Sequence, residues 1–170
     1  MLKDQRGFIA MYVLLIFLII AFSCFAFAGI AALGAKKNAV MTYQWFGEAV
    51  NFAADAVGRG RNMTEADYAA KTSEARQWFV YAFSQELEAT TDGYNFNSWL
   101  KIYPGPIKLV SFTYAPPGTV APGGGRTAKP GYEAVIEVPV LKVTLPFIEP
   151  QYVTVPMRQV GVVKGTAEVR

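Results

Sequence analysis

The N-terminal stretch Phe8–Ala35, with the sequence FIAMYVLLIFLIIAFSCFAFAGIAALGA, has no charged residue over 28 positions. Basic residues flank it on both sides, Lys3 and Arg6 before it and Lys36 and Lys37 after it. A helix of about 20 apolar residues spans the hydrocarbon core of a bilayer. The stretch is therefore long enough to cross a membrane or to form the apolar centre of a polymer.

The formal net charge of +3 is concentrated around this apolar run. Residues 1–37 carry four basic residues and one acid, whereas residues 38–170 carry twelve of each. Basic residues beside a long apolar segment are typical of membrane flanks. A neutral remainder lacks the basic patch of nucleic-acid-binding proteins. We therefore expect a membrane-associated chain with no specific nucleic-acid partner.

The side chains that commonly carry catalysis are sparse. The sequence has no histidine and a single cysteine, Cys24, inside the apolar run, which excludes a catalytic triad with histidine and an intrachain disulfide. Glu133 and Glu137 would lie about 13 Å apart along one strand, too far for an acid–base pair. We therefore expect no enzymatic activity, no cofactor and no metal site.

A short charged leader ends at Gly7, directly before Phe8 and the apolar run. The junction Arg6-Gly7-Phe8 and the long apolar helix after it resemble type IV pilins, and among them the pseudopilins of tight-adherence pili. The resemblance implies cleavage between Gly7 and Phe8 and export by a pilus assembly machinery. Most pilins carry a glutamate five residues after the glycine, where this chain has Tyr12. The resemblance then implies either a minor pseudopilin or a filament held by packing alone.

Small residues within the run would let neighbouring helices approach closely. If copies bundle through this segment, apolar burial drives assembly once the helix leaves the bilayer. We expect the helix–helix contacts of such a homo-oligomer to involve five positions: Tyr12, Ala21, Ala28, Gly29 and Ala32.

Two other interpretations of the N-terminus stay open. A cleavable secretory signal is indicated by the small-x-small triplet Ala26-Phe27-Ala28, but the apolar part before it exceeds the usual 7–15 residues. A plain single-pass anchor would use the same segment without polymerising. The anchor predicts a membrane protein that displays an extracytoplasmic binding or adhesion domain.

The helix is expected to continue beyond the apolar run, from about Phe8 to about Val57, because no proline interrupts it and apolar residues keep a helical spacing. Gly58 then favours its end. Thr64-x-x-Asp67 is a capping-box pattern, which predicts a second, amphipathic helix to about Glu88.

The residue composition of the chain changes after a loop expected at Thr90–Pro106. Three segments rich in Val, Ile, Thr and Tyr predict strands at Ile107–Ala115, Tyr132–Leu145 and Gln151–Lys164. Pro139 and Pro156 cannot donate to a strand ladder and are expected at edges or bulges.

The predicted fold class is therefore α+β, with a long N-terminal hydrophobic helix, a second helix and a C-terminal antiparallel sheet. We expect three parts: a leader at 1–7, a helix at 8–57 whose part 8–35 spans the membrane or forms a filament core, and an extracytoplasmic domain at 58–170 with its sheet from about 107. The favoured function is a structural subunit of an extracellular pilus-like filament, held in the cytoplasmic membrane before assembly and exposed at the cell surface afterwards.

Overall fold

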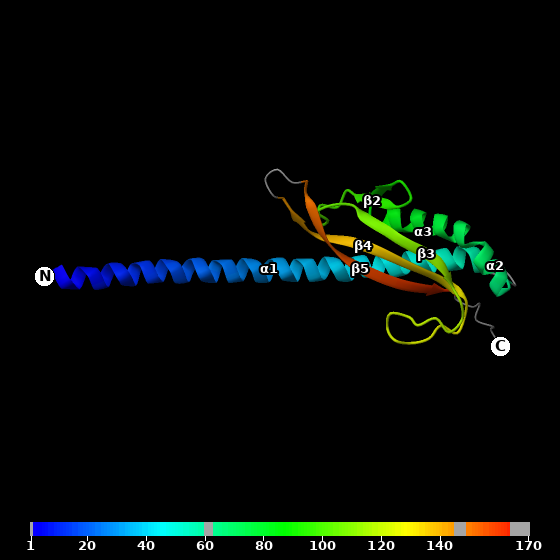
Figure 1. Cartoon of the computed structure of the whole chain (residues 1–170), viewed down its shortest axis with the longest axis horizontal. Helices are drawn as coiled ribbons and strands as arrows, with labels where there is room; N and C mark the ends of the chain where they lie inside the picture. The colour runs from blue at the N-terminus through cyan, green and yellow to red at the C-terminus, as the bar shows by residue number, and fades with distance from the viewer. Residues whose placement is uncertain (1, 60–62, 145–148, 164–170) are drawn as a thin grey trace. The chain divides into compact units, whose positions relative to one another are not determined.

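The computed structural model describes residues 2–59, 63–144 and 149–163 (Figure 1). The chain divides into two compact units, Met1–Val40 and Met41–Arg170. Over its described length the first unit consists of helix alone. The second contains the rest of that helix, two further helices and five strands. This is the α+β fold that the sequence predicts.

Helix α1 spans Leu2–Gly58. It therefore continues past the apolar run as predicted, and it also includes the leader from Leu2 onward. From residue 46 its buried residues recur every three or four positions, which is one face of a helix: Phe46, Ala49, Val50, Ala53, Ala54 and Val57. The helix ends where Gly58 lies directly against the hydroxyl of Tyr68 and the side chain of Val163, with no room for a Cβ atom.

The expected second helix is two helices, α2 at Glu65–Ala70 and α3 at Thr72–Glu86. Its start is as predicted, because the Thr64 hydroxyl and the Asp67 carboxylate form a reciprocal capping box. The break falls at Lys71, whose backbone is not helical (φ −93°, ψ 11°). The Thr72 hydroxyl donates to the Ala69 carbonyl over 2.8 Å. A threonine that bonds locally to the backbone competes with helical hydrogen bonding.

The five strands form one antiparallel sheet in sequential order, β1-β2-β3-β4-β5. Three of them match the predicted segments closely. These are β3 at Ile107–Ala115, β4 at Gly131–Val143 and β5 at Gln151–Val162. The predicted ends of the last two segments, at Leu145 and Lys164, lie outside the described residues, as do residues 146–148 between them.

Both strand prolines lie where a missing N–H is tolerated. Pro156 is on β5, an edge strand of the sheet. Pro139 is at the bulge between Pro139 and Leu141, beyond the last β4 residue that pairs with β3. Edge strands and bulges are the positions where strands accept proline.

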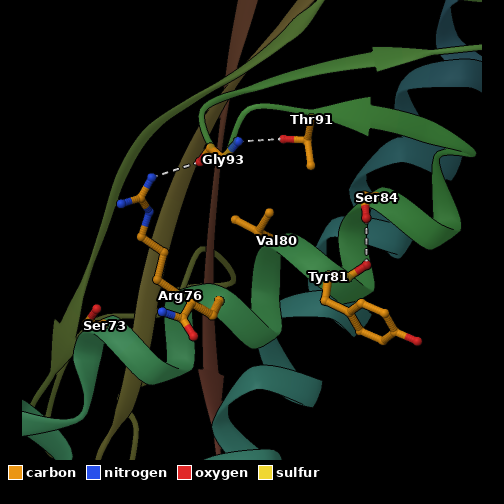
Figure 2. Close-up of a pocket in the computed structure, with 8 residues that line it drawn as sticks. Ser73, Arg76, Val80, Tyr81, Ser84, Thr91 and Gly93 are labelled. Atoms are coloured by element: carbon orange, nitrogen blue, oxygen red, sulfur yellow. Dashed lines mark hydrogen bonds between the residues drawn. The ribbon is translucent and has the colours of Figure 1, made fainter.

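The prediction of a loop at Thr90–Pro106 was wrong for its first part. That part forms two strands, β1 at Ala89–Thr91 and β2 at Asn95–Ser98. The turn between them is built by Asp92, which accepts hydrogen bonds from the backbone of Tyr94 and from the backbone and side chain of Asn95. Gly93 supplies the positive φ of 90°. In Figure 2 the Arg76 side chain of α3 reaches this turn.

Hydrogen bonds from the side-chain amide and backbone of Asn95 and from the backbone of Tyr94 lower the pKa of Asp92 to about 2. A carboxyl with a lowered folded-state pKa stabilises the fold above its ordinary pKa of 3.8, and this contribution is lost as pH falls toward 2. We expect Asp92→Asn to lower the thermal unfolding temperature at pH 6, and the difference from the parent to shrink between pH 4 and pH 2. Thermal scans of both proteins across this range measure it. A difference that is constant with pH would contradict the expectation.

The core of the second unit is rich in phenylalanine. Phe79 and Phe83 of α3 lie within 6 Å of Phe46 of α1, with ring centroids 5.9 and 5.7 Å away. Phe79 also packs on Phe112 of β3 at 5.4 Å. The apolar side of the predicted amphipathic helix therefore packs on both α1 and the sheet. All these contacts lie within Met41–Arg170.

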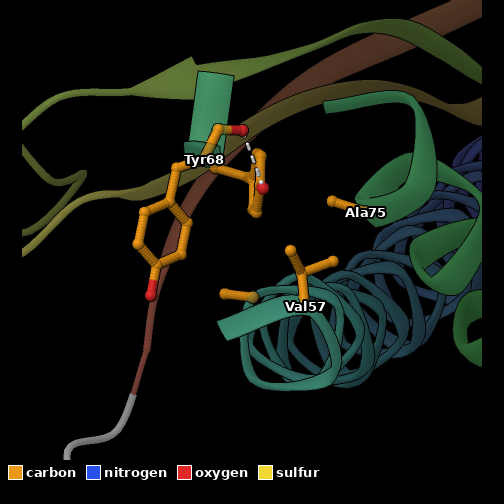
Figure 3. Packing of buried hydrophobic residues seen from close by; sticks show 5 residues of the cluster. Val57, Tyr68 and Ala75 are labelled. Atoms are coloured by element: carbon orange, nitrogen blue, oxygen red, sulfur yellow. Dashed lines mark hydrogen bonds between the residues drawn. The ribbon is translucent and has the colours of Figure 1, made fainter. Parts of the chain in front are cut away.

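A second cluster closes the core near the end of α1. Ala54, Val57, Tyr68, Ala75 and Tyr132 are buried together, as Figure 3 shows for Val57, Tyr68 and Ala75. The buried Tyr132 hydroxyl donates to the Tyr68 carbonyl over 3.0 Å. Burial raises the pKa of Tyr132 to about 12, so this hydroxyl remains a donor at physiological pH.

Candidate functional site

The first candidate surface is the apolar part of α1. From Phe8 to Leu33 its large side chains are exposed, from 48% for Leu18 to 79% for Phe25. None of the most apolar window of this helix is buried within the chain. By length and composition the helix could cross a membrane. A water-soluble protein rarely exposes a continuous apolar surface of this size without a partner or a membrane.

The predicted contact positions do not share one face of the helix. At about 100° per residue, Ala21, Ala28 and Ala32 fall on the same side. Gly29 lies roughly a quarter turn away, and a Cβ atom there would meet nothing within 4 Å. Tyr12 lies on the side opposite Ala21, and its ring makes an edge contact with Phe8 at 4.9 Å. A neighbouring helix could therefore use the alanine face, while Tyr12 would meet a different neighbour.

The predicted cleavage junction lies within α1, because Gly7 and Phe8 both have helical backbone. A peptidase needs an extended substrate backbone at the bond it cuts. Cleavage would therefore require the first turns of the helix to open locally.

A second apolar surface lies on the far end of the β4–β5 pair, and the sequence analysis did not identify it. Val138 is only 3% exposed, and its partner Val155 is 41% exposed. The next apolar pair, Leu141 and Val153, is 56% and 49% exposed. Val153 and Val155 lie four and two residues before the buried Met157 on β5, so they share its face and continue the buried side of the sheet. The signal available in the sequence was this period-two pattern of apolar residues.

The polar chemistry of the described residues is limited. No group of three or more His, Cys, Asp or Glu side chains among them could hold a metal ion. Cys24 is an exposed free thiol within the apolar part of α1. The shorter of the two ion pairs among the described residues joins Arg158 to Glu133 by two 2.7 Å hydrogen bonds. It crosses between β5 and β4 and lowers the pKa of Glu133, an arrangement that stabilises the sheet.

Comparison with known proteins identifies no relative: no protein-family model, curated protein or solved structure matches the chain. The architecture itself, a long apolar N-terminal helix followed by an antiparallel sheet, is pilin-like.

Proposed function

We propose that this chain is a structural subunit of an extracellular pilus-like filament that polymerises through residues 8–35 of α1. The observation that carries the proposal is the contrast between the two units. Residues 41–163 bury a phenylalanine-rich core of their own, whereas the apolar part of α1 before Val40 is exposed. An apolar helical segment outside the core of its own chain needs lipid or copies of itself around it.

Burial supplies enough free energy for such assembly. Fully burying one Leu, Ile or Phe side chain contributes about 1.5–3 kcal/mol, and this segment exposes more than a dozen large apolar side chains. Transfer from lipid to a helix bundle gains less, because lipid is already apolar, and close packing of small residues then matters more. The alanine face formed by Ala21, Ala28 and Ala32 is suited to that close approach.

The absence of a glutamate near the start of α1 favours assembly by packing. An acid in a bundle of apolar helices needs a paired cation. In this chain Tyr12 occupies the position at which most pilins carry that glutamate, and no charged side chain lies between Phe8 and Ala35. In the proposed pathway the chain is first held in the cytoplasmic membrane by α1. After cleavage between Gly7 and Phe8, an assembly machinery extracts it from the membrane. The second unit then faces the exterior of the filament.

The exposed apolar end of the β4–β5 pair also supports contacts between subunits. Leu141, Val153 and Val155 expose apolar surface that would be buried against a neighbouring subunit in a closely packed polymer. In a monomeric domain displayed alone this surface would stay exposed to solvent.

The alternative is a single-pass membrane protein that displays the second unit as an extracytoplasmic binding domain. The length and composition of α1 favour this alternative, because they are sufficient for the helix to span a bilayer without any partner molecule. The two functions differ in whether the chain leaves the membrane.

Negative-stain electron microscopy of material sheared from cells, combined with intact mass spectrometry of the subunit, tests the proposal. We expect filaments that contain this chain with Phe8 as its first residue. Filaments built from the uncleaved chain would support the polymer but contradict cleavage between Gly7 and Phe8. Material found only in detergent-extracted membranes, with no filaments, would contradict the proposal and favour the membrane-anchored domain.

A further inference from the structure

A pocket of about 420 Å³ lies within the second unit between helix α3 and the β1–β2 turn (Figure 2). Its size is within the usual range of small-molecule sites. One residue in its lining, Arg76, is positively charged, and most of the others are neutral and polar. The residues that bear on its chemistry are Ser73, Arg76, Gln77, Val80, Tyr81 and Thr91.

Arg76 is fixed in place by contacts that leave its charge unneutralised. Its guanidinium donates to the Gly93 carbonyl over 2.8 Å and to the Tyr94 hydroxyl over 3.2 Å, and it lies 4.0 Å from the centre of the Tyr94 ring. These hydrogen bonds use two of its five N–H donors. Within the described part of the chain, no carboxylate forms an ion pair with it. A guanidinium held in this way is preorganised to bind an anion.

The carboxylate of Asp92, which is part of the β1–β2 turn, does not form an ion pair with Arg76. Both oxygens of Asp92 accept hydrogen bonds from Asn95 and Tyr94, and Asp92 does not line the pocket. The lining therefore presents one cation without a counter-charge. A ligand that carries a carboxylate would supply that charge.

The remaining polar groups suit a ligand with several hydroxyls. Thr91 accepts from the Gly93 N–H over 2.9 Å, which leaves its own O–H free to donate. Gln77 is exposed and offers both a carbonyl and an amide group. Ser73, also exposed, adds a hydroxyl at the rim. In Figure 2 the Tyr81 ring points away from Val80 and Thr91, and it makes an edge contact with Trp78 at 6.3 Å.

We propose that this pocket binds an acidic saccharide, with its carboxylate on Arg76 and its hydroxyls on Ser73, Gln77 and Thr91. An acidic peptide is less favoured, because Ser73, Gln77 and Thr91 offer partners for several hydroxyls, whereas Val80 is the one aliphatic side chain in the lining. The inference goes beyond the filament proposal and does not depend on it, since the pocket lies entirely within one subunit.

Binding can be measured on the full chain in a detergent without sugar groups, by isothermal titration with trigalacturonate. The matched control ligand is the fully methyl-esterified trimer, which keeps the hydroxyls and removes the charge. We expect the acidic trimer to bind and the ester to bind at least about tenfold more weakly, a difference of about 1.4 kcal/mol. Equal binding of both, or no binding of the acidic trimer at millimolar concentration, would overturn the proposal.

Gln77→Glu tests the location of the site. Gln77 is exposed and makes no described hydrogen bond, and glutamine and glutamate have similar helix propensities, so the fold is preserved. The new charge should weaken trigalacturonate binding by about tenfold or more. The control variant Gln85→Glu makes the same change at an exposed position on α3 outside the pocket and should leave binding unchanged. Equal effects of the two variants would refute the site. Equal affinity for triglutamate and trigalacturonate would refute the saccharide assignment.

Discussion

Replacing Ala28 with aspartate is expected to abolish filaments of this chain while the second unit, Met41–Arg170, stays folded. Ala28 lies on the alanine face of α1 and is exposed within its own chain. A carboxylate in the apolar part of a membrane helix costs about 2.5–3.5 kcal/mol, and no cation lies between Phe8 and Ala35 to pair with it. Counts of filaments per cell by negative-stain microscopy, with immunoblots of the total protein, measure the effect.

The matched control is Ala66→Asp, which makes the same substitution at an exposed position in the first turn of α2. An acid there is favourable to the helix dipole, so filament yield should stay at the parent level. Near-ultraviolet circular dichroism of both purified variants checks that the second unit is folded. If cells with Ala28→Asp still make normal filaments, residues 8–35 are not the contact that holds the polymer together.

Gly161→Ala is expected to destabilise the second unit strongly, although it adds only one methyl group. A Cβ atom at Gly161 would lie 2.6 Å from the Val50 carbonyl oxygen and 2.8 Å from the Asn51 nitrogen. Both atoms belong to the backbone of α1, which cannot rotate away as a side chain could. Overpacking of this kind costs about 3 kcal/mol, which corresponds to a fall of roughly 10 °C in the unfolding temperature. Thermal scans of the full chain in detergent measure it.

Gly123→Ala is the control for that experiment. Gly123 lies in the exposed connection between β3 and β4, and a Cβ atom there would meet nothing within 4 Å. The same methyl group should therefore change stability by less than about 0.5 kcal/mol. Comparable losses in both variants would mean that α1 does not pack closely on β5, and the description of the core would have to change.

Strong local patterns made most of the fold predictable. Ile107–Ala115 was predicted to its last residue, because the segment is rich in β-branched and aromatic residues and is bounded by proline and glycine. The extension of α1 to Gly58 followed from helical spacing without proline. In these segments the local preference and the tertiary packing favour the same structure.

The errors fall where a single side chain decides the backbone. Thr90–Pro106 lacks the apolar alternation of a strand, and β1 and β2 form there because Asp92 and Gly93 build a tight turn. The break at Lys71 lies beside one threonine hydroxyl that bonds to a carbonyl three residues earlier. A pattern averaged over many residues cannot detect either effect.

The two candidate sites, the apolar surface of α1 and the pocket beside α3, also differ in how far the sequence could predict them. The apolar surface of α1 is contiguous in sequence, so it was predictable, although the helix places Tyr12 away from the alanine face. The pocket could not be predicted, because Arg76 meets Gly93 and Tyr94 only after α3 packs beside the β1–β2 turn. No motif connects residues that lie 17 or 18 positions apart.

The position of Pro156 on the edge strand β5 has a consequence for the fate of unassembled chains. An open strand edge is a template on which other chains can add without limit, and a proline in that edge removes a donor from it. Sheet-to-sheet aggregation of the second unit is thereby disfavoured, whereas contact between apolar helices is not affected. Subunits that accumulate at high density should therefore remain recoverable as monomers in detergent instead of forming amyloid.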